Sequence, residues 1–128
     1  MNLLLDTHVF LWWLEKHPRL SARAVSAIAH PDNGIYVSAA SIWEIGIKHR
    51  LGKLLLPTDD LADLPEIIMD EGMEPLSISP AHAVKAAAWE TRHRDPFDRM
   101  LAAQAQLDRL TLVSADNVFK LFDIKCLW

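Results

Sequence analysis

Four carboxylates in this chain each follow a predicted strand or lie early in the helix behind one. Asp6 ends the run Met-Asn-Leu-Leu-Leu-Asp, and Asp116 ends Thr-Leu-Val-Ser-Ala-Asp. Glu44 lies in Ser-Ile-Trp-Glu-Ile-Gly-Ile-Lys, and Asp98 lies in Asp-Pro-Phe-Asp-Arg-Met-Leu. If the strands are parallel neighbours, these acids meet at one edge of the sheet. Acids gathered there repel one another, so the pattern favours a divalent-metal site for phosphoryl-transfer chemistry.

The ligand types indicate which ion such a site would bind. Carboxylates are hard ligands, and the chain has neither clustered cysteines nor histidines at metal-ligand spacing, so Mg²⁺ or Mn²⁺ is favoured over zinc. One ion would activate a water for in-line attack on phosphorus. The same ion or a second one, roughly 3.5–4 Å away, would stabilise the leaving oxygen.

Each acid also has a purely structural explanation. Asp6 and Asp116 precede predicted helices, so either could be an N-cap whose side chain accepts a backbone hydrogen bond. Asp95 is followed by Pro96, and proline is favoured at the first helical position. We therefore interpret Asp95 as a structural N-cap.

Glu44 and Asp98 lie within predicted helices, so the other residues on the same helix face indicate whether each acid is exposed or buried. Lys48 follows Glu44 by four residues, the spacing of a solvated ion pair, so Glu44 taken alone is expected at the surface. Asp98 instead leads an apolar stripe that starts at Leu101, and a carboxylate there needs a partner to offset its desolvation. Four acids at such comparable positions favour a cluster over capping alone.

The composition describes one folded domain over residues 1–128. Of these residues 51% are hydrophobic and five are tryptophan, which excludes a disordered chain. No segment approaches the roughly 20 apolar residues of a transmembrane helix, and no signal-peptide pattern precedes Asp6. The single cysteine, Cys126, excludes an internal disulfide and suits a cytoplasmic protein. The formal charge of −4 argues against a simple basic nucleic-acid binder but not against a nuclease.

Apolar strands alternate with amphipathic helices along the chain. Strands are predicted over 3–5, 35–38, 73–78, 111–114 and 124–127. Helices are predicted after Asp6, after Ser21, over about 39–51, from 59 or 60 to 72, over 80–91, over 96–109, and briefly before the last strand. This alternation predicts an α/β fold with a parallel sheet covered on both faces, whose sites lie at the carboxyl ends of the strands. Pro75 predicts that the third strand lies at an edge.

The motifs, taken in order, resemble a known family. Asp-Thr-His near the start, Ser-Ile-Trp-Glu, Asp-Pro-Phe-Asp-Arg-Met-Leu-Ala-Ala-Gln-Ala and Ser-Ala-Asp near the end resemble the PIN-domain ribonucleases. They look most like the VapC toxins of prokaryotic toxin–antitoxin pairs. The resemblance runs over nearly the whole chain, and the block 95–105 is its specific part. By position, Asp6, Glu44, Asp98 and Asp116 fall on the acidic quartet of the family, without a departure.

The resemblance implies a fold, an activity and partners. The fold would be a PIN-like three-layer α/β/α sandwich with a mostly parallel central sheet of four to five strands. The activity would be Mg²⁺- or Mn²⁺-dependent endonucleolytic cleavage of RNA, such as tRNA or another structured RNA. The metal would be held by Asp6, Asp98 and Asp116, and Thr7 and Ser114 match recurrent hydroxyl positions. A homodimer is also implied, together with a cognate antitoxin whose C-terminal segment covers the site.

Three other interpretations of the sequence were compared with that of a nuclease. A catalytically silent PIN-like module that acts only through protein contacts would keep the scaffold, and loss of an acid from the quartet would favour it. An aspartyl-phosphate phosphatase also begins with an acid after a strand, but it needs a second acid where His8 stands. A receiver domain needs paired acids after the first strand, which are likewise missing. The nuclease interpretation is the best supported.

Basic and aromatic residues surround the predicted site in the sequence. Candidates to hold RNA phosphates on either side are Lys48, His49, Arg50, Lys53, Arg92, His93, Arg94 and Arg99. Trp12, Trp13, Trp43 and Trp89 are interpreted as core or interface residues rather than as platforms for bases. Trp12 and Trp13 point about 100° apart on a helix, so one is predicted to line an aromatic groove for a partner helix.

Overall fold

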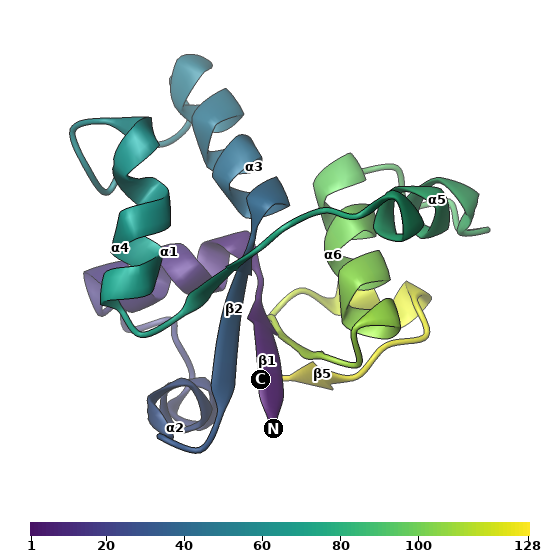
Figure 1. Ribbon diagram of the computed structural model, residues 1–128, viewed down its shortest axis with the longest axis horizontal. Coiled ribbons are helices and arrows are strands. Elements are labelled where there is room, and N and C mark those ends of the chain that lie inside the picture. The colour runs from purple at the N-terminus through teal and green to yellow at the C-terminus, as the bar shows by residue number, and fades with distance from the viewer.

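Five apolar segments form one parallel sheet in the computed structural model, which describes residues 1–128 (Figure 1). The strands are β1 (Asn2–Leu5), β2 (Gly34–Ser38), β3 (Glu74–Leu76), β4 (Thr111–Val113) and β5 (Cys126–Leu127). Their order is β3-β2-β1-β4-β5, and every neighbouring pair is parallel. The predicted parallel sheet is confirmed, and β3 lies at an edge as Pro75 indicated.

Six α-helices and two short 3-10 helices connect the strands. They are α1 (Thr7–Glu15), α2 (Ala22–Ala29), α3 (Ala39–Arg50), η1 (Leu61–Asp63), α4 (Leu64–Asp70), α5 (Pro80–Ala88), α6 (Pro96–Leu107) and η2 (Asn117–Leu121). The hydroxyls of Ser21, Ser38 and Ser79 cap α2, α3 and α5. Asp95 caps α6, as its sequence context predicted. No helix is both long and apolar enough to cross a membrane.

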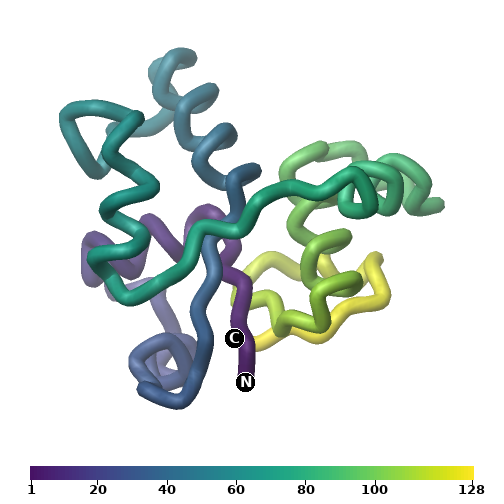
Figure 2. Tube along the Cα trace, in the orientation of Figure 1, coloured from purple at the N-terminus to yellow at the C-terminus, as the bar shows by residue number.

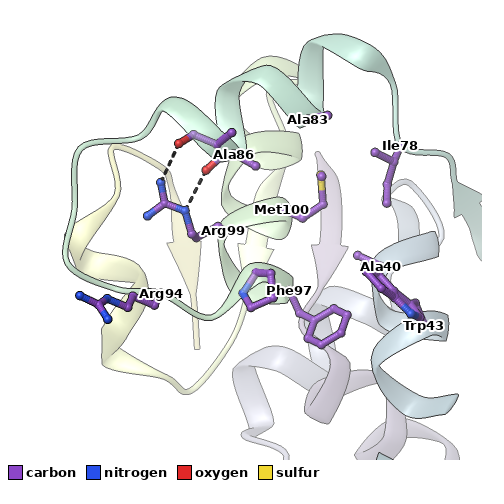
Figure 3. A pocket seen from close by; sticks show the side chains of 11 residues that line it. Ala40, Trp43, Ile78, Ala83, Ala86, Arg94, Phe97, Arg99 and Met100 are labelled. Carbon is purple, nitrogen blue, oxygen red and sulfur yellow. Dashed lines mark hydrogen bonds between the residues drawn. The ribbon is translucent and has the colours of Figure 1, made fainter. Parts of the chain in front are cut away.

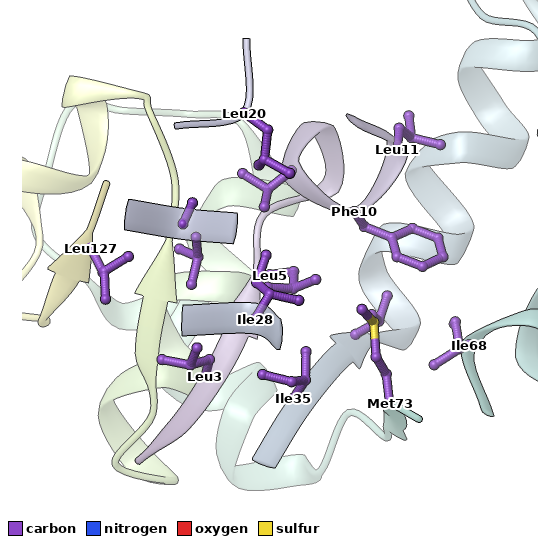
Figure 4. Close-up of a cluster of buried hydrophobic side chains, with 14 of the residues drawn as sticks. Leu3, Leu5, Phe10, Leu11, Leu20, Ile28, Ile35, Ile68, Met73 and Leu127 are labelled. Carbon is purple, nitrogen blue, oxygen red and sulfur yellow. The ribbon is translucent and has the colours of Figure 1, made fainter. Parts of the chain in front are cut away.

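The sheet separates two hydrophobic cores because successive strand side chains point to opposite faces. Leu3 and Leu5 pack on one face with α1, α2 and α4, in a core of 16 buried residues that includes Phe10 (Figure 4). Leu4 packs on the other face, in a core of eight buried residues that includes Leu101 of α6. Figure 1 shows the same division, with α1, α2 and α4 on one side and α5 and α6 on the other. The predicted three-layer sandwich is therefore confirmed.

Several elements are shorter than the sequence patterns predicted. Of the predicted strands 73–78 and 124–127, only 74–76 and 126–127 pair in the sheet. The helix predicted over 80–91 ends at Ala88, and the one predicted over 96–109 ends at Leu107, just before Arg109 turns left-handed with φ 55°. Because β3 ends at Leu76, the segment 77–79 is free to carry the chain across the sheet, from the side of α4 to the side of α5 (Figure 2).

The carboxyl ends of the central strands lie level, and this places the site. Leu5 pairs with Val37 of β2 on one side and with Val113 of β4 on the other. The chain runs outward from β1 through β2 to β3, whereas β4 and β5 lie on the opposite side of β1, so the strand order reverses between β1 and β4. Open parallel sheets bind ligands in the crevice at such a reversal. Here Asp6 follows β1 and Ser114 follows β4.

Substitution of Leu4 tests whether the eight-residue core on the α6 side of the sheet contributes to stability. Its side chain is fully buried in the central strand, so Leu4→Ala should lower the free energy of unfolding by about 2–5 kcal/mol through lost burial and the cavity left behind. Urea titration measures this change. Leu55 is 88% exposed, and Leu55→Ala should change the value by less than about 0.5 kcal/mol. Equal losses in the two variants would contradict the core assignment.

Candidate active site

Asp6 is held by a hydroxyl group at the end of the neighbouring strand. Its backbone N–H donates to the Val113 carbonyl at 3.0 Å, which continues the pairing of β1 with β4. The Ser114 hydroxyl donates to Asp6 Oδ2 at 2.7 Å, and the residue is only 8% exposed. Asp6 stands at the N-cap position of α1, but its side chain accepts no capping hydrogen bond. The capping explanation is therefore wrong for this carboxylate, which binds Ser114 instead.

Glu44 is buried, contrary to the surface position that its spacing with a lysine suggested. It is 5% exposed, and Thr7 Oγ1 donates to its Oε1 at 2.6 Å. The Ser41 hydroxyl lies 2.9 Å from the same threonine oxygen. Because the threonine hydroxyl has one hydrogen and the carboxylate can only accept, Ser41 donates to Thr7. Two hydroxyl groups therefore fix one side of the Glu44 carboxylate.

The second oxygen of Glu44 faces the predicted lysine partner. The Lys48 ammonium lies 2.6 Å from Glu44 Oε2, so the expected ion pair exists, although its acid is buried. The difference from the sequence-based expectation comes from tertiary structure, since α3 packs against α1 and so brings Thr7 to Glu44. A pattern within one helix cannot reveal a contact with another helix.

Asp98 lies in the first turn of α6, directly after the residue that caps this helix. Asp95 Oδ1 accepts from the backbone N–H groups of Phe97 and Asp98 at 2.9 and 3.1 Å. The Asp98 side chain meets His93, whose Nε2 lies 2.8 Å from Oδ2. An ionised carboxylate can only accept, so His93 Nε2 donates this hydrogen bond. His93, which the sequence suggested for phosphate binding, is thus engaged with an acid of the site.

Asp116 is the exception among the four acids. It is exposed, and its Oδ1 accepts from the Val118 backbone N–H at 3.0 Å as the N-cap of η2. Its own N–H donates to Ser114 Oγ at 3.0 Å, so the hydroxyl that binds Asp6 also fixes the turn that carries Asp116. No three acids, histidines or cysteines lie close enough together to hold a metal ion jointly. The structure links Asp116 to Asp6 through Ser114 without bringing it into a shared metal-binding cluster, so its metal-binding and catalytic roles stay predictions.

The other three acids act on one another through their charges. Burial raises the pKa of Asp6; the hydrogen bond from Ser114 lowers it, and the charge of Glu44 raises it. Burial also raises the pKa of Asp98 to about 6, and the charges of Asp95 and Asp6 add to this effect. A bound cation would relieve this repulsion. Mg²⁺ keeps several waters and needs only one or two protein carboxylates, so the oxygen donors of Asp6 and Asp98 fit Mg²⁺ or Mn²⁺.

Arg99 has a structural task that the sequence analysis missed. Its guanidinium group donates hydrogen bonds to backbone carbonyls at the end of α5 and in the loop behind it (Figure 3 shows two of them). The acceptors are the carbonyl oxygens of Ala86, Ala87, Trp89, Thr91 and His93. Carbonyls at a helix end lack helical partners, and an arginine fork satisfies several at once. Arg99 is therefore not a free phosphate-binding cation, and it holds the loop that carries His93 to Asp98.

Comparison with known proteins identifies the family. The family model described as PIN domain matches residues 3–125, nearly the whole chain. The chain belongs to the PIN-domain family. Ribonuclease VapC22 of Mycobacterium tuberculosis is 32% identical to this PIN-domain protein over 117 residues, which cover 91% of this chain and 88% of the relative. Ribonuclease VapC16 of the same organism is 40% identical over 77 residues, or 57% of this chain, and the match spans about half of that relative, 55% of its length.

Solved structures share the fold of this PIN domain. A chain in the crystal structure of VapBC2 from Rickettsia felis, bound to a DNA fragment from their promoter, superimposes with a TM-score of 0.73 at 19% identity, covering 100% of this chain and 99% of that one. A chain of VapBC-1 from nontypeable Haemophilus influenzae gives a TM-score of 0.70 at 19% identity, with 99% and 97% covered. The resemblance to VapC-type PIN-domain ribonucleases that the motifs indicated is therefore confirmed, as is the fold.

The raised pKa of Asp98 predicts how stability depends on pH. The carboxyl group ionises near its ordinary value of 3.8 in the unfolded chain but keeps its proton up to about pH 6 in the folded, metal-free protein. Between these values the folded state binds more protons than the unfolded state, so the free energy of unfolding should fall as pH rises. Urea titrations in EDTA across this range measure the slope.

Asp98→Asn provides the matched control for this pH dependence. The asparagine side chain keeps a hydrogen-bond acceptor for His93 but carries no titrating group, so the part of the slope that Asp98 contributes should vanish. The variant should also be more stable than the wild-type protein near neutral pH, because it lacks one partly buried negative charge that the neighbouring acids repel. An unchanged slope would show that the Asp98 carboxyl is solvated like an ordinary one.

Proposed function

We propose that this protein is a metal-dependent endoribonuclease that cleaves RNA and acts as the toxin of a toxin–antitoxin pair. The observation that carries the proposal is a group of mutually repelling carboxylates, the buried Asp6 and Glu44 and the partly buried Asp98, placed where the strand order of a parallel sheet reverses. The curated relatives, both named ribonucleases, support RNA as the substrate. The proposed target is a structured RNA such as tRNA.

Mg²⁺ or Mn²⁺ is the proposed cofactor, with Asp6 and Asp98 as its principal ligands and Asp116 as a further one. Such an ion, when bound, activates a water for attack on phosphorus and stabilises the leaving oxygen. Asp6 reaches this task with its carboxylate already oriented by Ser114. Asp116 is free to approach because it is exposed and its hydrogen bond to Val118 N–H uses only one of its oxygens.

The remaining residues keep the acids in place while RNA binds. Thr7 fixes Glu44 through its hydroxyl group, and Asp95 fixes the first turn of α6, from which Asp98 projects. His93 holds one oxygen of Asp98 and leaves the other free. Side chains that are locked before substrate arrives need no reorganisation during the reaction, which is how active sites gain rate from a rigid scaffold.

An apolar groove on the α1 and α2 side of the fold supports the proposed antitoxin partner. Trp13, Leu20 and Val25 line it, and Glu71 at its rim accepts a 3.0 Å hydrogen bond from Trp13 Nε1. Trp12 and Trp13 are both partly buried, so neither is the exposed tryptophan that the sequence predicted, and Trp13 is the one that lines this groove. We infer that the groove receives an apolar helix of the cognate antitoxin, whose C-terminal segment continues to the acidic site.

A second apolar face supports the proposed homodimer. Trp43 is 60% exposed and packs edge-on against Phe97 at 5.1 Å between ring centres, so of the two roles predicted for it, core or interface, its exposure favours the interface. These rings line a pocket with Ile78 and Met100, between α3, α5 and α6 (Figure 3). An exposed tryptophan in an apolar hollow is typical of an interface, so this face is our proposed contact between two copies of the chain.

Cleavage of total cellular RNA tests the proposed activity. The wild-type protein with Mg²⁺ or Mn²⁺ should produce discrete fragments, and EDTA should abolish them. Asp6→Asn and Asp98→Asn should each slow cleavage by at least about a hundredfold, since each removes a metal ligand while the fold is kept. Asp123 is an exposed acid in the loop that leads into the amino end of β5, whereas the candidate site lies at the carboxyl ends of the strands. It provides the control variant Asp123→Asn, which should cut RNA at the wild-type rate.

Two outcomes would contradict the proposal in different ways. Wild-type rates in Asp98→Asn would refute the site assignment. Failure of the antitoxin-free wild-type protein to cut RNA with either metal would favour the catalytically silent module that acts only through protein contacts.

The partner groove makes its own prediction. Trp13→Ala should weaken binding of the cognate antitoxin by about tenfold or more, because a partly buried tryptophan in a groove is a typical binding hot spot. Calorimetric titration with the antitoxin encoded nearby measures this, and Trp89→Ala is the control because Trp89 packs on the other core against Phe122. If the Trp13→Ala variant binds the antitoxin as tightly as the wild-type protein and still forms the dimer, the groove is not a partner site.

A further inference from the structure

Lys48 occupies an unusual position for a lysine in an ion pair with a residue four positions earlier. Its ammonium lies 2.6 Å from Glu44 Oε2, and Glu44 is almost fully buried while the Lys48 side chain is 36% exposed. Ordinary pairs of this spacing lie on a solvated helix face with both partners in water. Here the lysine stands at the boundary between the buried acids and solvent, where an incoming RNA strand would first meet the site.

The charges around Lys48 come from two helices. Partial burial acts to lower its pKa, but the hydrogen bond and charge of Glu44 and the charges of Asp95 and Asp98 outweigh this and raise it. The ammonium group therefore stays charged and stands within the field of acids from both α3 and the start of α6. This position is distinct from that of Arg99, whose guanidinium group is occupied by backbone carbonyls.

The ammonium group has hydrogen-bonding capacity to spare. It carries three N–H donors, and the contact with Glu44 uses one of them. No other hydrogen bond or ion pair of Lys48 to a side chain occurs in the structure, and its exposed fraction shows that solvent reaches it. A phosphodiester that approaches the carboxylates is repelled by them. A fixed cation at the entrance, with free donors, is the chemical complement of that anion.

We propose that Lys48 is a substrate-binding residue of the active site, which holds Glu44 with one N–H and binds a non-bridging oxygen of the RNA phosphate with another. This inference rests on the proposed function and adds to it a phosphate contact that does not depend on the metal. Lys48 would place the phosphate against the acids and offset their repulsion of the backbone. The other assignment for the residue, a purely structural partner of Glu44, makes different predictions.

Binding of bulk tRNA in EDTA, measured over a range of KCl concentrations, separates the two roles without the metal. Each phosphate contact contributes about 0.7 to the slope of log affinity against log salt for single-stranded RNA and about 0.9 for a duplex. Lys48→Met should therefore reduce the magnitude of this slope by roughly the amount that one phosphate contact contributes, and Lys48→Arg should restore the wild-type slope. Lys125 is an exposed lysine at the amino end of β5, whereas the candidate site lies at the carboxyl ends of the strands. Lys125→Met is therefore the control variant, and its slope should be unchanged.

Because Lys48→Met leaves Glu44 without its cation, a second variant guards against misfolding. Glu44→Gln combined with Lys48→Met removes both charges of the pair, so it should fold, as checked by urea titration, yet it should show the same loss of slope. A slope equal to that of the wild-type protein in this double variant and in Lys48→Met would overturn the proposal and leave Lys48 a structural residue.

Cleavage of total cellular RNA with Mg²⁺ gives an independent readout. Lys48→Met should cut at least about tenfold more slowly, with Lys48→Arg recovering most of the rate, because an arginine also donates to phosphate. If Lys48→Met cuts as fast as the wild-type protein, this inference fails while the proposed function stands. If the wild-type protein neither binds nor cuts RNA, the proposed function itself has failed.

Discussion

Repulsion between buried carboxylates is the constraint on which the arrangement of this site depends. Asp6 and Glu44 are buried and Asp98 is partly buried where the strand order reverses, and burial together with mutual repulsion raises the pKa of Asp6 and Asp98. Each acid has its own compensation: a hydroxyl group from Ser114, a hydroxyl group and an ammonium group for Glu44, and an imidazole for Asp98. Such a set tolerates the metal-free state, and a cation bound among the acids would relieve the repulsion that remains.

The sequence predicted the layers well because they depend on local patterns. A short apolar run such as Leu3–Leu5 is consistent with a buried strand, and its alternation with amphipathic helices favours a parallel sheet. The helix caps at Ser21 and Asp95 were readable for the same reason. Element ends were predicted less well: α5 stops at Ala88, where Arg99 from another helix takes up the free carbonyls, and no pattern within 80–91 could reveal that contact.

The candidate site could be predicted as a list of acids but not as a geometry. Glu44 with a lysine four residues on has the pattern of a surface pair, and only its contact with Thr7, 37 residues away, explains its burial. Asp6 and Asp116 share the same sequence context before a helix, yet only Asp116 uses its side chain as a cap. The block 95–105 was recognised as a motif, but only the structure shows what its members contact: Asp95 caps the helix, Asp98 accepts a hydrogen bond from His93, and Arg99 binds a carbonyl of the preceding loop.

The pairing of Asp6 with Ser114 also bears on how the protein is made. The two residues are 108 positions apart, and β1 occupies the middle of the sheet between β2 and β4. Asp6 therefore gains its partner only after Ser114, 108 positions later in the chain, has been synthesised. Contacts of such long range form late, after the segments between them are available. In the nascent chain these acids are dispersed, and the pairing that orients Asp6 forms only once β4 and Ser114 are available.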